Sequence, residues 1–172
     1  MAVLDGKTAP IADATRGTGW AVDAPAVVRA VYAALASVDP DTIHAAAAEY
    51  FDDDIVVHEP ESLPWGGVYR GRELVTGLMA GIGDPASPID AANLTIDNVI
   101  HTPDGDSHQV IAAVSFPWRG AGSVPGHMRA LEWFTVRAGK VTEIRVYLWD
   151  TAAGIAALQP AAMPSMNEEA QS

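Results

Sequence analysis

One acidic residue stands in the middle of an otherwise apolar strand face. From Met128 to Val136 the sequence alternates, so Glu132 shares a face with the apolar residues Met128, Ala130, Phe134 and Val136. A carboxyl group on such a face costs free energy unless it is neutral, paired or used in chemistry. Glu132 is therefore the first candidate for a functional acid.

A second carboxyl group ends an earlier strand. Residues 55–59, Ile-Val-Val-His-Glu, predict a strand that stops at Pro60. A poorly hydrated carboxylate can remove a proton from carbon, because desolvation raises its basicity. Glu59 is thus the candidate base, and a neutral Glu132 would donate a hydrogen bond to the enolate oxygen. His58 alternates to the opposite face, and a bend before Pro60 would bring it to the rim as a second proton carrier.

Each candidate also has a purely structural interpretation. Glu59 can be an exposed strand end, His58 can be structural, and Asp150, a further catalytic candidate, can cap the helix that follows it. Glu132 can be a buried acid satisfied by one of three neighbours, Tyr32, Trp118 or Arg129. The functional interpretation therefore requires Glu59 and Glu132 to converge on one dry pocket.

Composition limits the functional classes. A chain of 172 residues with 49% hydrophobic residues fits one domain, and its net charge of −12, with ten scattered Lys and Arg, disfavours nucleic acid. No cysteine is present, and the histidines other than His58 are too dispersed to indicate a metal site: His44, His101, His108 and His127. We therefore expect no metal and no cofactor. Without a signal-like or membrane-spanning apolar run, we expect a soluble cytoplasmic protein with no membrane partner.

The hydrophobic periodicity predicts three helices, with one strand inserted before the third, followed by an antiparallel meander. The predicted helices are 25–38, 41–51, 74–82 and 151–158, with Asp41 or Thr42 as the cap of the second. The predicted strands are 55–59, 93–101, 107–119, 128–136 and 144–148. An acidic turn at 52–54 precedes the first strand, and a turn at 137–140 joins the last two. Residues 60–72 are predicted to form an ordered loop. We expect an N-terminal arm at 1–23, a domain at 24–158 and a tail at 159–172. Such a sheet can curl around the helices and leave a mainly apolar pocket.

Aromatic and large apolar residues fall on both faces of the predicted sheet. Those expected to contact a small hydrophobic substrate are Tyr32, Trp65, Tyr69, Trp118, Met128, Phe134 and Leu148. Trp133, Tyr147 and Trp149 alternate to the opposite face, where they predict a homodimer interface.

The order and spacing of three segments resemble a known superfamily. These segments are VVRAVYAALASVDPDTIHAAAAEYFDDDIVVHEP, VYRGRE and MRALEWFTVRAGKVTEIRVYLWDT. Together they resemble the nuclear transport factor 2-like superfamily, which includes ketosteroid isomerase, limonene epoxide hydrolase and the SnoaL-like polyketide cyclases. The resemblance implies a cone-shaped α+β barrel, with three N-terminal helices packed on a curved, mainly antiparallel sheet that encloses an apolar pocket.

The steroid isomerase branch gives the best catalytic match. Glu59-Pro60 resembles the aspartate-proline of its general base, and Met128 to Phe134 resembles the segment of its protonated oxyanion-hole acid, with Glu132 at the acid position. This division of roles is borrowed from the isomerase, a known example of paired carboxyl groups. The resemblance aligns Val31 with the tyrosine of that oxyanion hole and places Tyr32 beside it. One residue turns a helix by roughly 100 degrees, so the sequence leaves open whether Tyr32 faces the pocket.

The other branches match less closely. In place of the acids of limonene epoxide hydrolase, the chain has VIAAVSF on the central strand and Val146 near the last-strand position. The ending LWDTAAGIAAL and His58 resemble the general SnoaL-like pattern.

Two functional hypotheses follow. One is a cofactor-independent isomerase, cyclase or lyase that acts beside a carbonyl on a polyketide- or steroid-like substrate. The other is a non-catalytic ligand-binding or dimerisation domain.

Overall fold

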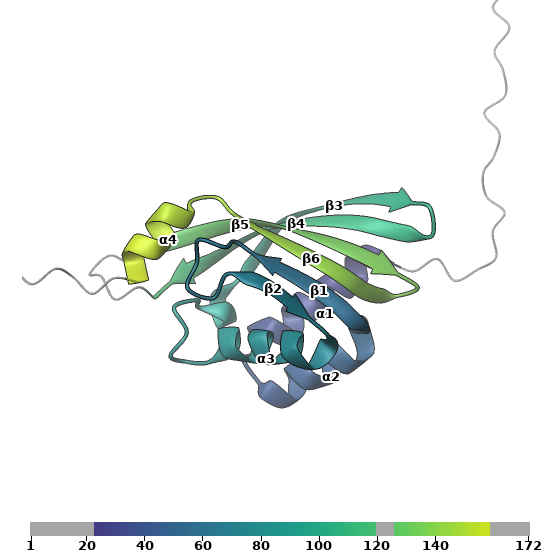
Figure 1. Cartoon of the computed structure of the whole chain (residues 1–172), viewed down its shortest axis with the longest axis horizontal. Helices are drawn as coiled ribbons and strands as arrows, with labels where there is room; N and C mark the ends of the chain where they lie inside the picture. Colours follow the sequence, from purple (N-terminus) through teal and green to yellow (C-terminus); the bar gives the residue numbers. More distant parts are fainter. Residues whose placement is uncertain (1–22, 120–125, 159–172) are drawn as a thin grey trace, which may run out of the picture.

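The computed structural model describes residues 23–119 and 126–158, and Figure 1 labels its elements. The helices are α1 (Ala24–Ala36), α2 (Pro40–Tyr50), α3 (Arg72–Gly83) and α4 (Thr151–Leu158), with a short 3-10 helix at Ala91–Asn93. The strands are β1 (Phe51–Glu59), β2 (Gly67–Arg70), β3 (Thr95–Asp104), β4 (Ser107–Trp118), β5 (Gly126–Arg137) and β6 (Lys140–Leu148). The predicted tail and all but the last residue of the predicted arm lie outside the described residues.

The sheet is mixed and open, with the strand order β2-β1-β6-β5-β4-β3. Strand β1 runs parallel to β6, and the other neighbouring pairs are antiparallel. Helices α1, α2 and α3 lie against one face of the sheet, and α4 lies at one end (Figure 1). The α+β architecture, with helices packed on a curved and mainly antiparallel sheet, is thereby confirmed.

Aspartate side chains cap the N-termini of the first two helices. The Asp23 carboxylate accepts a hydrogen bond from the Ala26 N–H at 3.0 Å, and the Asp39 carboxylate accepts one from the Thr42 N–H at 2.9 Å. These bonds satisfy amide groups that have no partner within the helix. The prediction that Asp41 or Thr42 caps the second helix was wrong, because Pro40 is already in the first turn and the cap lies before it.

Two parts of the strand prediction also need correction. Strand β1 begins at Phe51 rather than Ile55, because the acidic segment predicted as a turn continues the strand through an irregular pairing with β6 between Phe51 and Val56. The predicted loop at 60–72 contains β2, which pairs antiparallel with β1. Four residues among glycines and prolines carry little periodicity, so this short edge strand was missed.

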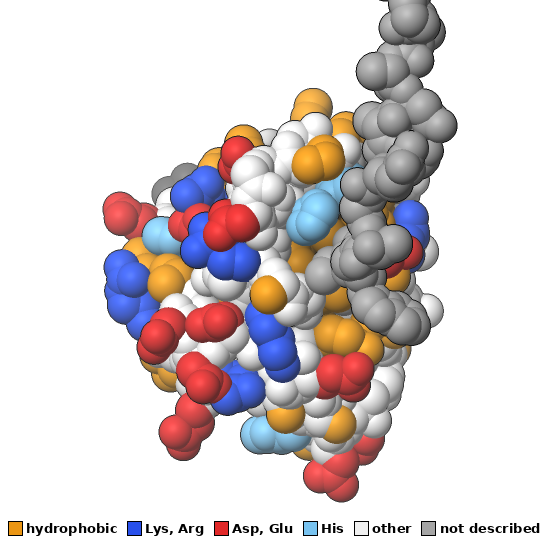
Figure 2. Space-filling model, turned by 90° about the vertical axis from the view of Figure 1, so that its right-hand side faces the viewer, with side chains coloured by type: hydrophobic (Ala, Val, Ile, Leu, Met, Phe, Trp, Pro, Cys, Tyr) orange, Lys and Arg blue, Asp and Glu red, His pale blue; other side chains and the backbone are white. Residues whose placement is uncertain are grey.

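The β5–β6 hairpin follows the predicted alternation. Met128, Ala130, Phe134 and Val136 are buried on the helix-covered face, and the partly buried Glu132 lies between Ala130 and Phe134 on the same face. The turn places Ala138 at φ 48° and Gly139 at φ 81°, a left-handed pair that suits a tight hairpin. Figure 2 views the end of the molecule that carries the β3–β4 and β5–β6 turns, where acidic and basic side chains are interspersed.

The hydrophobic core lies between this sheet face and the helices. Phe51, Ile55 and Phe134 from the sheet and Val28 and Ile43 from the helices are almost completely buried. Burying a side chain of this size stabilises the fold by about 1.5–3 kcal/mol. The candidate acids therefore lie within a face that is otherwise committed to packing.

Candidate active site

Glu59 and Glu132 reach the same cavity from two strands that are separated by β6. Glu59 ends β1 on the face that also buries Val57, and Glu132 lies near the middle of β5. Val146 on the intervening strand pairs with Glu132 and lines the cavity beside both acids. The pairing of β1 with β6 thus brings together two carboxyl groups that are 73 positions apart in the chain.

The cavity has two lobes. The tyrosine lobe, of about 60 Å³, is lined by Val31, Tyr32, Leu35, Val57, Glu59, Val75, Leu78, Met79, Ile82, Glu132, Phe134, Ile144 and Val146. The tryptophan lobe, of about 50 Å³, is lined by Leu35, Glu59, Leu63, Trp65, Ile82, Ile89, Leu94, Phe116, Trp118, Ala130, Glu132, Val146 and Leu148. Glu59 and Glu132 belong to both lobes, and neither lining set contains Lys, Arg or His.

Enclosure by this apolar lining changes the acidity of both carboxyl groups. Burial raises the pKa of Glu132 from 4.5 to about 7, and the nearby Tyr32 hydroxyl acts in the opposite direction. Burial, and then the charge of Glu132, raise the pKa of Glu59 from 4.5 to about 8, whereas the Trp65 indole lowers it. Both carboxyl groups therefore lose their protons near neutral pH instead of near pH 4.5.

Tyr32 faces the cavity and lies beside Glu132. Burial and the Glu132 carboxyl raise the pKa of the Tyr32 phenol well above its ordinary value, so this hydroxyl stays protonated as a donor. The hydroxyl is buried without a hydrogen bond that meets ordinary geometry among the described residues, and its ring packs edge-on against Phe134 at 5.7 Å. The orientation of α1 therefore directs Tyr32 into the cavity, a point that the sequence left open. Val31 also reaches the lobe, because both side chains point toward the sheet.

Aromatic side chains form a wall in the tryptophan lobe. The rings of Trp65 and Trp118 lie 6.0 Å apart, and the ring of Phe116 lies 6.3 Å from that of Trp118. Leu148 also lines this lobe. Leu35, Ile82 and Val146 line both lobes but were not singled out from the sequence, since an apolar residue that lines a cavity has the same pattern as one in a filled core.

His58 and Asp150 lie outside both lobes. The His58 Nε2 atom is 3.0 Å from Glu143 Oε1 on the outer sheet face, and the other oxygen of Glu143 accepts from Arg145 at 2.8 Å. His58 and Glu59 share only a surface depression beside Pro60. Asp150 is exposed directly before α4, where its backbone carbonyl accepts from Gly154 at 3.2 Å.

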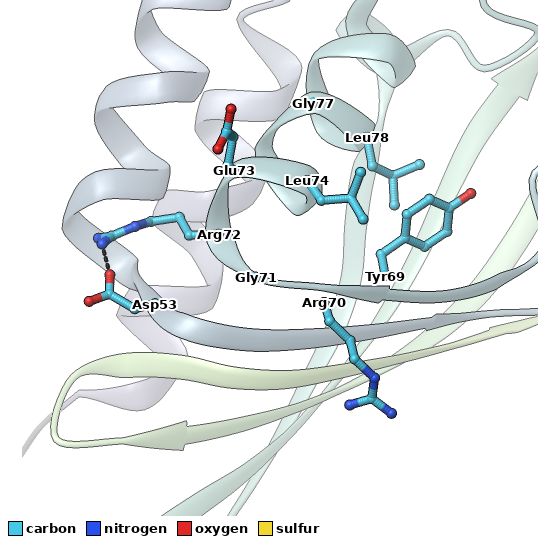
Figure 3. Close-up of a pocket in the computed structure, with 9 residues that line it drawn as sticks. All are labelled: Asp53, Tyr69, Arg70, Gly71, Arg72, Glu73, Leu74, Gly77 and Leu78. Carbon is cyan, nitrogen blue, oxygen red and sulfur yellow. Dashed lines mark ion pairs between the residues drawn. The ribbon is translucent and has the colours of Figure 1, made fainter.

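Two predicted substrate contacts also lie elsewhere. Met128 is buried against α4, with its terminal methyl close to Gly154, and is not among the residues that line the lobes. Tyr69 lines a separate, open depression of about 760 Å³ at the start of α3, which Figure 3 shows together with the ion pair of Arg72 and Asp53. The Tyr69 hydroxyl donates to the backbone carbonyl of Trp65 and so holds the loop that carries this wall residue.

An apolar surface groove of about 330 Å³ adjoins the cavity. It is lined by α3, by the segment after that helix and by the loop before β2: Gly77, Leu78, Gly81, Ile82, Ser87, Pro88, Ile89 and Trp65. Leu78 also lines the tyrosine lobe, Trp65 and Ile89 also line the tryptophan lobe, and Ile82 lines both. The groove is therefore separated from the interior by side chains alone.

Within residues 23–119 and 126–158, no cluster of three or more His, Asp or Glu side chains has the arrangement of a metal site. Over the same ranges, no helix is long and apolar enough to cross a membrane.

The chain matches the family described as SnoaL-like domain over residues 28–144, which is more than half of its length, and it belongs to that family. No curated protein matches it significantly. The match includes α1 from Val28 onward, both acid-bearing strands and the start of β6.

Solved structures show the same fold. Bal32a, from a soil-derived mobile gene cassette, is 22% identical, with 78% of this chain and 95% of that chain covered and a TM-score of 0.61. A Catenulispora acidiphila protein with a ketosteroid isomerase-like fold, in complex with trimethylamine, is 21% identical, with 72% and 85% covered and a TM-score of 0.53. The hub of CaMKII from S. rosetta is 21% identical, with 77% and 99% covered and a TM-score of 0.57.

Proposed function

We propose that this protein is a cofactor-independent acid-base enzyme of the isomerase, cyclase or lyase type, which moves a proton beside the carbonyl of a small, neutral, hydrophobic substrate. The observation that carries this proposal is that Glu59 and Glu132 line one apolar cavity beside the Tyr32 hydroxyl. A cavity without a cation disfavours anionic substrates, since two carboxyl groups already compete there for one proton.

In the proposed reaction, Glu59 removes a proton from the carbon next to the substrate carbonyl. The electron pair moves toward the carbonyl oxygen, where Glu132 and Tyr32 donate hydrogen bonds to the developing enolate. Returning the proton to another carbon completes an isomerisation. Attack of the enolate on a second carbonyl gives cyclisation, and loss of a leaving group gives elimination.

The pKa order of the free site differs from this division of roles. Glu59, at about 8, holds its proton more tightly than Glu132, at about 7, so the free pair carries its first charge on Glu132. A carbonyl oxygen bound beside Tyr32 favours a neutral, donating Glu132, because a carboxylate would repel that oxygen. Substrate binding would thereby move a proton from Glu59 to Glu132. Glu59 would then carry the negative charge and could act as the base.

The proposed assembly is a homodimer formed through the outer sheet face. Large apolar side chains are exposed on this face: Ile100, Leu131, Trp133, Tyr147 and Trp149, the last at 81% exposure. Apolar aromatic patches of this kind are typical of interfaces between proteins. Because the acids lie on the opposite face, association would leave the cavity accessible from the helix side.

The reaction is tested by ring opening of 5-nitrobenzisoxazole across pH, with wild-type protein and Glu59→Gln. This probe requires only a desolvated base and an apolar pocket. We expect turnover above buffer that falls by at least ~10²-fold in Glu59→Gln, the usual contribution of a positioned base. Equal rates for the two proteins would refute Glu59 as the base and favour the alternative function, a ligand-binding or dimerisation domain without catalysis.

A further inference from the structure

The tryptophan lobe contains a hydrogen-bond donor that the proposed reaction does not use. The side chain of Trp118 is 2% exposed, and its indole N–H has no acceptor among the described residues. Leaving such a donor unpaired costs about 1–3 kcal/mol. A phenylalanine would fill much of the same space without this cost, so packing alone does not explain the indole.

Neighbouring residues leave the Trp118 N–H available to a ligand. Trp65 and Phe116 both lie against the Trp118 ring, yet neither offers an acceptor atom from its side chain. The Trp65 indole acts on Glu59 instead, where it lowers the pKa of that carboxyl. The two tryptophans therefore differ in role, because only one of them has an acid within reach.

The position of Trp118 fixes the length of a ligand that would reach it. Trp118 pairs with Gly126, whereas Glu132 pairs with Ala112. Six strand residues therefore separate the two backbone positions, or roughly 20 Å. Glu132 and Trp118 both line the tryptophan lobe, so their side chains lie closer together than their backbones. Tyr32 lines only the tyrosine lobe and Trp118 lines only the tryptophan lobe, so a ligand that contacts both must extend through both lobes. The lobes, of about 60 and 50 Å³, must also widen to admit a larger ligand, and Trp65 and Ile89 on the adjoining groove are the side chains placed to move.

We propose that Trp118 forms a second polar subsite, which donates a hydrogen bond to a distal oxygen of an uncharged ligand with at least two rings. One oxygen of this ligand lies beside Tyr32 and Glu132, and an acceptor oxygen at its far end lies against Trp118. The apolar rings between them contact the residues shared by the two lobes, such as Leu35 and Val146. This inference rests on the proposed ligand cavity and adds the substrate class to it.

The subsite is tested by binding of two matched ligand pairs, measured by calorimetry without any turnover. The shorter pair is 6-methoxy-2-naphthol and 6-ethyl-2-naphthol, and the longer pair is 4′-methoxybiphenyl-4-ol and 4′-ethylbiphenyl-4-ol. Within each pair the ligands have nearly the same shape, and only the methoxy compound has a distal acceptor. In at least one pair, the wild type is expected to bind the methoxy compound ~3- to 10-fold more tightly, as for one neutral hydrogen bond.

Trp118→Phe is expected to reduce this ratio to about one by removing the donor. Trp133→Phe, the matched control on the outer sheet face, should retain it. If Trp118→Phe does not fold, the indole ¹⁵N–H resonances of the wild type provide a second measurement. One of them should move downfield with the methoxy ligand and not with its ethyl partner. No methoxy preference in either pair, or a preference that survives in Trp118→Phe, overturns the subsite. That result would not affect the proposed function, which is tested separately by the loss of benzisoxazole turnover in Glu59→Gln.

Discussion

The two faces of the sheet place neighbouring residues in opposite chemical environments. On the helix-covered face, Glu59 and Glu132 are enclosed by apolar side chains, and the pKa of each carboxyl is raised. On the outer face, the adjacent His58 contacts Glu143, and the adjacent Trp133 donates to Gln109 at 2.7 Å. The same strands therefore carry a reactive environment on one side and ordinary surface interactions on the other.

This difference teaches that residue type alone does not identify the acid-base group. Histidine has the more suitable intrinsic pKa for proton transfer near neutral pH. His58, however, lies among surface groups, whereas burial moves the pKa values of two glutamates into the same range. In the proposed function, enclosure by the fold, more than the side chain itself, gives the two glutamates pKa values suited to proton transfer.

The largest expected contrast is between adjacent substitutions on β1. Glu59→Gln should remove benzisoxazole ring opening by at least ~10²-fold, whereas His58→Gln should retain the rate within about threefold, since its side chain is outside both lobes. Steady-state rates of both variants at pH 8.5 check this. A loss in His58→Gln as large as that in Glu59→Gln would mean that the two faces are chemically coupled.

The second contrast concerns stability as a function of pH. Because the folded-state pKa of Glu132 is raised, its contribution is most favourable below about pH 4.5 and is lost as pH rises through 7. As pH rises from 4.5 to 9, the free energy of unfolding of Glu132→Gln should therefore increase by on the order of 2–3 kcal/mol relative to that of the wild type. Urea unfolding at the two pH values measures this difference. Glu143→Gln on the outer face is the control that removes a carboxyl group outside both lobes.

A third, smaller effect tests the outer face. Leu131→Arg adds a cation to an exposed apolar patch near Arg129 and Arg145, and should weaken the proposed dimer by roughly tenfold or more. Leu74→Arg, a similarly exposed position on α3, is the matched control and should leave association unchanged. Sedimentation over a concentration series gives both dissociation constants. Equal association of the two variants would remove the outer face as the interface.

The alternation of β5 made much of the site predictable. Glu132 was expected on the buried face with Phe134 because period two depends only on local sequence, and the structure confirms that placement. The hairpin turn at Gly139 was equally local. Both inferences required no knowledge of which strands are neighbours.

Non-local features were beyond the sequence. The convergence of Glu59 with Glu132 depends on the parallel pairing of β1 with β6, which no short pattern encodes. The direction of Tyr32 depends on how α1 rotates against the sheet, and β2 was missed because it is a four-residue edge strand. The raised pKa values were expected only on the condition that both acids enter one dry pocket, and the sequence could not establish that enclosure, because long-range contacts create it.

Direct titration of the paired carboxyl groups tests the central claim most closely. In protein labelled with ¹³C at the glutamate side-chain carboxyl carbon, Glu59→Gln and Glu132→Gln identify the two signals by their loss. The account predicts that both titrate with apparent midpoints near 7 and 8, and that removing Glu132 lowers the pKa of Glu59. Midpoints near the ordinary value of 4.5 for both groups, unchanged by either substitution, would contradict a proton-sharing pair and the function built upon it.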